Sequence, residues 1–223
     1  MNKKLIVVFI VMALMVGACS FGTISFNTVV GSGKVSSETR RVSGFISIVL
    51  KGATNVDVAF GNSESVIVEA DDNIVPLVET VVQNGQLVIR AQSNASFITR
   101  NSIRVRVTMK SLKGVTLKGS GNITVSGLSG DGLIVDLPGS GNFTVTGAAD
   151  AVQISLPGSG NIYCIGLKAK SAKVTLNGSG NIMVYASQSL DANIRGSGTI
   201  RYDGNPAQVS KSVTGSGSIT PWG

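Results

Sequence analysis

Histidine is absent from this 223-residue sequence, and cysteine, proline and aromatic residues are scarce, at two residues, five residues and 5%. Without histidine the chain lacks the side chain that most often serves as a general base or metal ligand near neutral pH, which excludes histidine-dependent catalysis. Charged residues make up only 14%, and no stretch combines the apolar spacing of an amphipathic helix with a convincing cap. Apolar and polar residues instead alternate along most of the chain, which predicts strands.

The first twenty residues are typical of a bacterial lipoprotein signal. Lys3 and Lys4 precede an uncharged apolar run over 5–16, which is shorter than the roughly 20 residues of a spanning helix. Small residues then precede Cys19 in the string VGAC, at the spacing of a lipobox. We expect residues 1–18 to be a lipoprotein signal peptide, and residues 19–37 to be the N-terminus, lipidated at Cys19, with a short tether. An ordinary signal peptide with a chance cysteine is the alternative.

The mature chain is therefore expected at the cell envelope, with its lipid in the membrane. Two acyl signals already hold a protein stably on a bilayer. Ser20 stands where an aspartate would resemble an inner-membrane retention signal, which favours the outer membrane. Loss of Lys3 and Lys4 lowers the net charge from +7 to +5, so the mature chain is moderately basic.

A short glycine motif recurs six times in the second half of the chain. GSGNI stands at 119–123, 158–162 and 178–182, with GSGNF at 139–143, GSGTI at 196–200 and GSGSI at 215–219. The first glycines lie 20, 19, 20, 18 and 19 residues apart, a regularity that is typical of a solenoid. At about 3.3 Å per residue, one period makes three short strands and three corners, which is one coil of a β-helix.

Apolar residues occupy equivalent positions in successive repeats. Ile123, Phe143 and Ile162 are each the last residue of a motif copy, and polar residues alternate with such columns. Inward columns would stack into a core, and outward columns would face solvent. The sequence thus predicts an all-β fold, a right-handed single-stranded parallel β-helix (solenoid) with coils of about 19 residues.

Each GSG motif is expected to be a structural corner. Glycine tolerates a positive φ, and its missing side chain lets coils approach to about 4.8 Å. The asparagines after four of the motifs should form a hydrogen-bonded ladder. A phosphate loop would need a lysine and a following helix, and a calcium-binding β-roll would need carboxylates at these positions. The predicted corner residues are Gly119, Gly121, Asn122, Gly139, Gly141, Asn142, Gly158, Gly160, Asn161, Gly178, Gly180, Asn181, Gly196, Gly198, Gly215 and Gly217.

Residues 38–110 lack the motif but contain similar strands. We therefore expect a single β-helix domain over 38–223, with irregular coils over 38–110 and regular coils over 111–223. The segment 71–83 breaks the rhythm and is expected to cross between strands with a short helical turn, limited by Pro76.

Three stretches together resemble the auto-transporter adhesin head GIN domain family: RVSGFISIVLKGATNVDV at 41–58, VIVEADDNIVPLVETVVQNGQLVIRA at 66–91, and the series of GSGNI-like corners. The resemblance covers nearly all of the mature chain. It implies a right-handed β-helix on a secreted or lipid-anchored bacterial protein, and it implies no catalytic residues.

An enzyme is the less favoured alternative, although polysaccharide lyases and hydrolases also use β-helices. The acids of the repeat half scatter between corners and faces, so they predict no carboxylate pair. Asp71 and Asp72, with Glu69 nearby, could bind calcium, but a solvated turn with a capping aspartate is favoured. Cys164 lies in an inward column and is expected to be a buried, inert thiol.

The preferred hypothesis is an adhesin-like binding module without catalytic activity, and the alternative is a structural or envelope-stress component without a specific ligand. Arg104, Arg106 and Lys110 should project outward together, either as a stripe for anionic partners or as an ordinary solvated strand. Expected partners are the membrane, through the lipid, and a glycan or a surface protein. We expect no cofactor, metal or nucleic acid, and the oligomeric state stays open.

Overall fold

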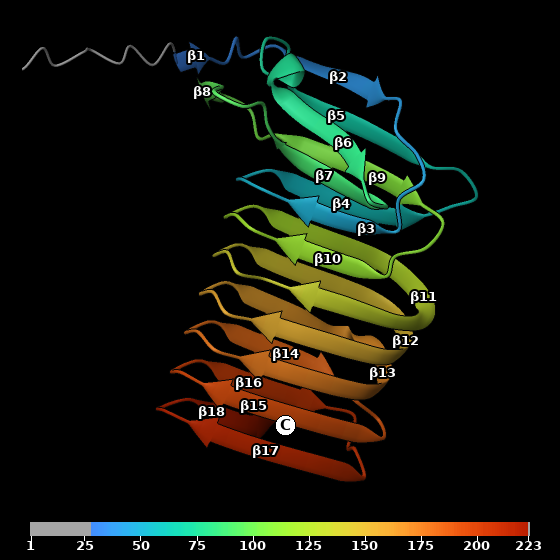
Figure 1. The fold of residues 1–223 in the computed structure, drawn as a ribbon, viewed down its shortest axis with the longest axis vertical. Coiled ribbons are helices and arrows are strands. Elements are labelled where there is room, and N and C mark those ends of the chain that lie inside the picture. The colour runs from blue at the N-terminus through green and yellow to red at the C-terminus, as the bar shows by residue number, and fades with distance from the viewer. Residues whose placement is uncertain (1–27, 223) are drawn as a thin grey trace, which may run out of the picture.

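Strands make up most of the protein over residues 28–222, the part that this computed structural model describes (Figure 1). The elements are β1 (Thr28–Val30), β2 (Val35–Arg40), β3 (Ser47–Leu50), β4 (Asn55–Phe60), β5 (Ser65–Asp71), the 3₁₀ turn η1 (Val75–Leu77), β6 (Val78–Gln83), β7 (Gln86–Ala91), β8 (Ser96–Ile98), β9 (Arg104–Met109), β10 (Gly114–Leu117), β11 (Asn122–Asp136), β12 (Asn142–Leu156), β13 (Asn161–Leu176), β14 (Asn181–Tyr185), β15 (Ser189–Arg195), β16 (Thr199–Asp203), β17 (Gln208–Thr214) and β18 (Ser218–Pro221). Sixteen strands form one sheet that winds into a β-solenoid, and β1 and β8 form a separate pair.

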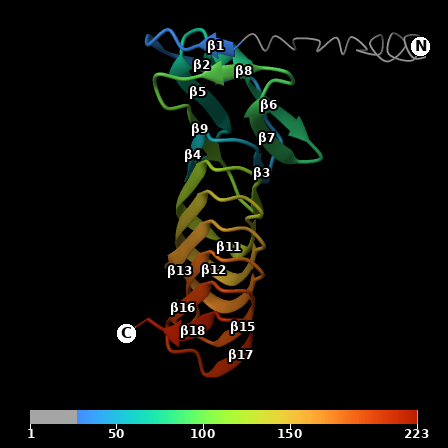
Figure 2. The ribbon, with the colours of Figure 1, turned by 90° about the vertical axis from the view of Figure 1, so that its left-hand side faces the viewer.

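The regular coils stack in parallel, each one period further along the chain. Asn122 is the register partner of Asn142, Asn142 of Asn161, and Asn161 of Asn181. Coils follow one another down the long axis, with the C-terminal strands at the far end (Figures 1 and 2). The predicted parallel β-solenoid is therefore confirmed.

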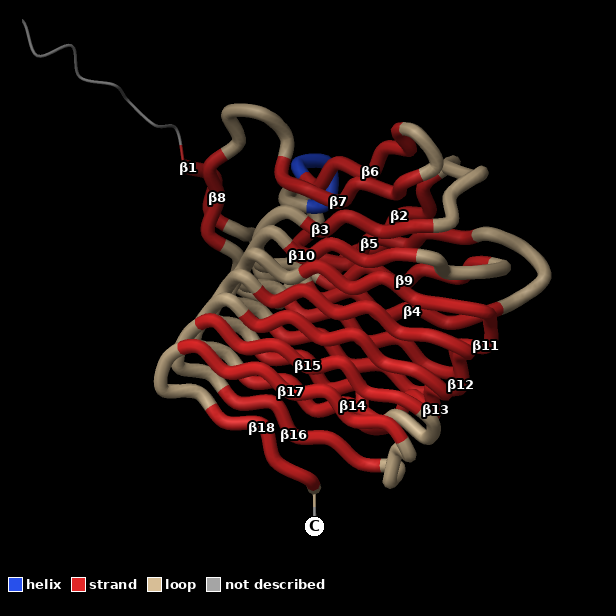
Figure 3. Tube along the Cα trace, turned by 60° about the horizontal axis from the view of Figure 1, so that its bottom comes forward, coloured by secondary structure: helices blue, strands red, loops and turns tan. Residues whose placement is uncertain are grey.

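The regular coils contain fewer and longer strands than the three short strands per coil that the sequence predicts. β11, β12 and β13 are single strands of 15 or 16 residues that bend without ending. Positive φ at Gly127 (76°) and Gly147 (133°) accompanies the bend in β11 and β12. The glycine motifs interrupt the strands along one edge of the stack (Figure 3). The expectation of three separate short strands is wrong in this detail, because a bulged strand can turn the bend and keep its pairing.

The predicted inward columns form the core. Ile123, Phe143, Ile162, Ile182 and Ile200 lie one above another, and each is at most 1% exposed. Burying one such side chain contributes about 1.5–3 kcal/mol to folding. The predicted burial of Cys164 is also confirmed, and burial raises the pKa of its thiol.

The N-terminal region differs from the predicted irregular coils. β3 and β4 do pair in parallel with β10 and β11, as a coil would. However, β5 pairs antiparallel with both β2 and β9, and β6 pairs antiparallel with β7. Asn84 and Gly85 have φ of 51° and 72°, which allows the two-residue hairpin between β6 and β7. β7 and β9 still stack in parallel on β3 and β4, but β5 and β6 then pair antiparallel with them and cap the solenoid (Figure 2).

β1 and β2 lie within 28–40, so strand structure begins at least ten residues before the predicted domain start at 38. The short helical turn predicted for 71–83 is confirmed as η1, which contains Pro76. The predicted signal peptide and Cys19 lie outside the described residues.

Within residues 28–222, no further coil stacks on β17 and β18. Val209 and Val213 are therefore 42% and 45% exposed, although their register partners Leu190 and Ile194 are buried. Lys211 takes the inward column where the preceding coil has Ala192, and its Nζ lies 4.6 Å from the centroid of the Tyr202 ring. A charge that points inward on an edge strand disfavours pairing with another chain.

Candidate binding groove

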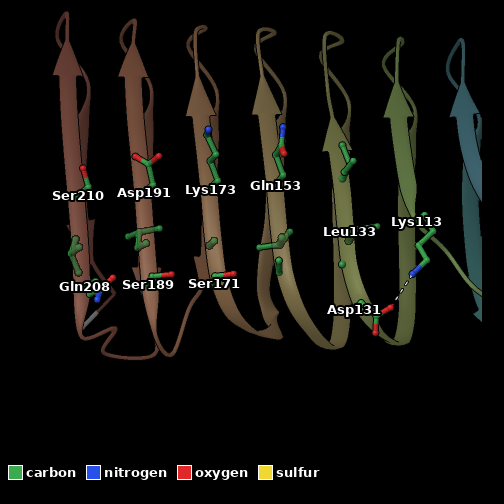
Figure 4. Close-up of a pocket in the computed structure, with 17 residues that line it drawn as sticks. Lys113, Asp131, Leu133, Gln153, Ser171, Lys173, Ser189, Asp191, Gln208 and Ser210 are labelled. Carbon is green, nitrogen blue, oxygen red and sulfur yellow. Dashed lines mark ion pairs between the residues drawn. The ribbon is translucent and has the colours of Figure 1, made fainter.

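An open groove of about 790 Å³ crosses the outer face of β11, β12, β13, β15 and β17 and reaches Lys113, which directly precedes β10 (Figure 4). Two rows of outward side chains line it, one on each side of an inward apolar column. The first row is Ile134, Gln153, Lys173, Asp191 and Ser210, and the second is Gly132, Ala151, Ser171, Ser189 and Gln208. Members of a row are register partners, so they repeat at the strand spacing of about 4.8 Å.

The groove exists because outward side chains in the second row are small. Strand alternation turns these positions outward, and four of the five are Gly, Ala or Ser. Each of them stands seven residues before the next motif, and each member of the first row stands five before it. Sequence reasoning missed this site, although a small residue stands seven positions ahead of four of the six motifs, which was a usable signal.

The charges that line the groove balance. Lys113 Nζ lies 3.5 Å from Asp131 Oδ2, and Lys173 is the register partner of Asp191 (Figure 4). The remaining polar groups, such as Gln153, are neutral, and no aromatic side chain is among the lining residues of the described chain. This surface suits an extended, uncharged ligand that exchanges hydrogen bonds with the protein.

The predicted corner glycines lie in the turns along one edge of the stack. The predicted corner asparagines lie at the starts of the strands that follow these turns. A Cβ on Gly160 would overlap the carbonyl oxygen of Gly141, and one on Gly141 would overlap that of Gly121. Gly180 and Gly198 face the same obstacle. Among the predicted corner glycines only Gly215, with φ of 119°, has a positive φ, so the positive-φ reason is wrong for the others. Close approach of stacked backbones is what requires glycine there.

The asparagine ladder expected beside these corners is present. Nδ2 of Asn142 donates to Oδ1 of Asn122 at 2.8 Å, and the Asn161 and Asn181 amides continue the series at 2.9 Å. Asn122 in turn donates to Asn55 at 2.8 Å. Asn55 belongs to the string GATNV at 52–56, a degenerate copy of the motif that precedes the six recognisable ones.

The basic stripe lies where the sequence placed it, but its charge is largely compensated. Arg104 and Arg106 on β9 and Lys110 directly after it are exposed, whereas the intervening inward side chains are buried. Arg104 pairs with Asp57 at 3.4 Å, and Arg106 pairs with Glu69 at 2.9 Å. These carboxylates come from the neighbouring strands β4 and β5. The ion pairs favour the alternative of an ordinary solvated strand.

Asp71 is fully buried, so the expectation that this residue lies in a solvated turn is wrong. It accepts hydrogen bonds from the amides of Gly33 (3.1 Å), Arg100 (2.8 Å) and Asn101 (3.3 Å), and from Asn101 Nδ2 (2.6 Å). Burial alone would raise the pKa of Asp71, but these hydrogen bonds outweigh it and hold the pKa below its usual value. Glu69 is engaged by Arg106, and no cluster of three or more potential metal-ligating side chains occurs within residues 28–222.

These features define a capped, parallel β-solenoid with a neutral groove on one outer face. A family model described as "Putative auto-transporter adhesin, head GIN domain" matches residues 44–206. The match covers more than half of the chain, so the chain belongs to this family, as the resemblance implied. No curated protein matches the chain, and no helix of the described part is long and apolar enough to cross a membrane.

Solved structures from Bacteroides fragilis and Parabacteroides distasonis show the same fold. A "putative adhesin" from Bacteroides fragilis is 24% identical with a TM-score of 0.74, over 87% of this chain and all of that one. A "putative adhesin" and a "putative lipid binding protein" from Parabacteroides distasonis are each 25% identical, with TM-scores of 0.55 and 0.53. Each covers 88% of this chain and 100% of its own. At these identities we take the likeness as evidence for the fold.

Proposed function

We propose that this protein is a lipid-anchored, non-catalytic binding module of the bacterial cell envelope that holds an extended, uncharged glycan in its groove. The groove across five strands is the observation that carries the proposal. The family's description as an adhesin supports a binding role at the cell surface.

A glycan fits the chemistry of the groove better than the other ligands considered. Sugar hydroxyls both donate and accept hydrogen bonds, and Gln153, Ser171 and Ser189 offer both functions in return. An anionic polymer would gain little because the lysines face aspartates. A protein partner would be expected to use Trp, Tyr or Arg anchors, which this groove lacks. One relative is described as lipid-binding, but an open polar groove offers an acyl chain little apolar enclosure.

Blocking the groove tests the binding role. Ser171→Trp fills the small-residue row, and Thr124→Trp places the same side chain on the other outer face as a matched control. On a glycan array, Ser171→Trp should weaken retention of the bound glycan at least tenfold, or about 1.4 kcal/mol, with Thr124→Trp unchanged. If both variants fold and retain the glycan equally, the groove is not the binding site. Absence of any glycan binding by the wild type would favour the structural or envelope-stress alternative.

The anchor is tested separately with Cys19→Ala. The variant should leave the detergent phase in a phase-partitioning experiment, or fail to be processed, because it cannot carry the lipid. A variant that stays in the detergent phase would remove the lipid from the proposal. The outer membrane, which Ser20 favours, is tested by membrane fractionation of the wild type.

A further inference from the structure

β1 and β8 form a small apolar tip at the capped end of the solenoid. Their register places Val30 beside Ile98, and these side chains are 53% and 61% exposed. Ile98 has the largest exposed fraction among the exposed large hydrophobic side chains of residues 28–222. Val29 and Phe97 alternate with them and pack against the core. The tip is therefore anchored on one face and presents apolar side chains to the outside on the other.

The tip is held firmly to the rest of the cap. Gly31 N donates to the Ile98 carbonyl at 2.8 Å, and Asn73 Nδ2 donates to the Val30 carbonyl at 2.8 Å. Asp71 joins the loop after β1 to the loop after β8 through the four hydrogen bonds described above. The direction in which Val30 and Ile98 point is thus fixed relative to the solenoid axis.

The chain reaches the tip directly from its proposed anchor. Only residues 20–27 separate Cys19 from β1, and eight residues span at most about 29 Å when fully extended. Arg100 is exposed next to this tip, where its side chain lies over Gly33, and it has no ion pair within residues 28–222. The nearby Lys34 is exposed and lies 3.9 Å from Asp72. A free cation near an anionic lipid surface is attracted to it.

We infer that the β1–β8 tip rests on the membrane that carries the lipid anchor, so that the solenoid points away from the bilayer. The inference rests on the proposed anchor. Two apolar side chains are too few to hold the protein on a membrane, so the lipid provides the attachment and the tip sets the orientation. The opposite end, which includes Trp222, then projects outward (Figure 2). From the first glycine motif to the last, five steps of about 4.8 Å add about 24 Å to this projection.

Tryptophan fluorescence can test the orientation because Trp222 is the only tryptophan in the sequence. The full-length lipidated protein is reconstituted into vesicles of phosphatidylethanolamine and phosphatidylglycerol, with or without bromine on the acyl chains. Ile98→Trp in a Trp222→Phe background should have a blue-shifted emission that brominated lipid lowers about twofold, since interfacial groups lie about 5–10 Å into the headgroup and acyl boundary. Wild-type Trp222 and a Val213→Trp, Trp222→Phe variant, both at the far end, should show no quenching.

Flotation of the vesicles distinguishes failure of the lipid anchor from failure of the tip to rest on the membrane. If the wild type does not float with the vesicles, the lipid anchor of the proposed function fails. If it floats but brominated lipid leaves the emission at position 98 unchanged, the tip does not rest on the membrane and the inference is overturned. Equal quenching at both ends would also overturn it. Should Ile98→Trp melt well below the wild type, Val30→Trp gives the same readout from the paired strand.

Discussion

Replacing Gly160 by alanine tests whether backbone contact between coils sets the glycine requirement. A Cβ at this position would overlap the Gly141 carbonyl oxygen and would lie 2.6 Å from Leu137 Cδ2. The obstacle is backbone in a stacked coil, so it cannot move without separating the coils. Two hydrogen bonds cross the same junction: Asn161 N donates to the Gly141 carbonyl at 3.1 Å, and Asn161 Nδ2 donates to Asn142 at 2.9 Å.

The expected loss follows from these contacts. Overpacking a filled site costs about 1–3 kcal/mol, and each weakened hydrogen bond adds about 0.5–1.5 kcal/mol. We expect Gly160→Ala to lower the free energy of unfolding by about 2 kcal/mol or more. For a chain of this size, that loss lowers Tm by about 4 °C or more.

Gly130→Ala is the matched control. No heavy atom lies within 4 Å of a Cβ at Gly130, and its φ is not positive. Alanine there should be neutral or stabilise by about 0.4–1 kcal/mol, because it restricts the unfolded chain. Circular-dichroism melts and urea titrations of both variants decide the matter. If the two substitutions change stability equally, close stacking of the coils is not what requires glycine at position 160.

Two further predictions concern buried side chains. Because the folded pKa of Asp71 lies below its unfolded value, its ionised form stabilises the fold above the unfolded pKa, and this stabilisation is lost as pH falls through the folded pKa. Urea titrations of Asp71→Asn should therefore show a deficit relative to wild type at pH 7 that shrinks below about pH 4, and a constant deficit would contradict this role. Cys164 should resist a bulky maleimide in the folded protein and react after denaturation, since burial raises the pKa of its thiol; rapid labelling without denaturant would disprove its burial.

Repetition made the regular coils predictable from sequence. A period near 19 residues and strict alternation place Ile123, Phe143 and Ile162 in one column, and the structure stacks them as expected. Asn122 and Asn142 follow the same rule, so their ladder could also be foreseen. In such a stack each residue mainly contacts its equivalents one period away, and sequence spacing directly indicates those contacts.

The N-terminal cap could not be foreseen in this way because its partners are far apart and follow no period. Asp71 accepts hydrogen bonds from Gly33 and Asn101, which lie 38 and 30 residues away in the sequence and outside the repeated glycine motifs. Alternation predicted that Arg104 would face outward, but only the pairing of β4 with β9 placed Asp57 within 3.4 Å of it.

The sequence by itself therefore determined the strands of the regular coils, their period and the inward columns, because each depends on residue type and spacing along the chain. Tertiary structure alone decided the antiparallel cap, the burial of Asp71 and the pairing of the basic stripe. Tertiary structure also decided which outward rows of side chains line the groove, because the groove depends on the sizes of side chains that neighbouring coils bring together. The corner glycines show both levels: their recurrence is visible in the sequence, but the carbonyl group that excludes a Cβ belongs to the coil before.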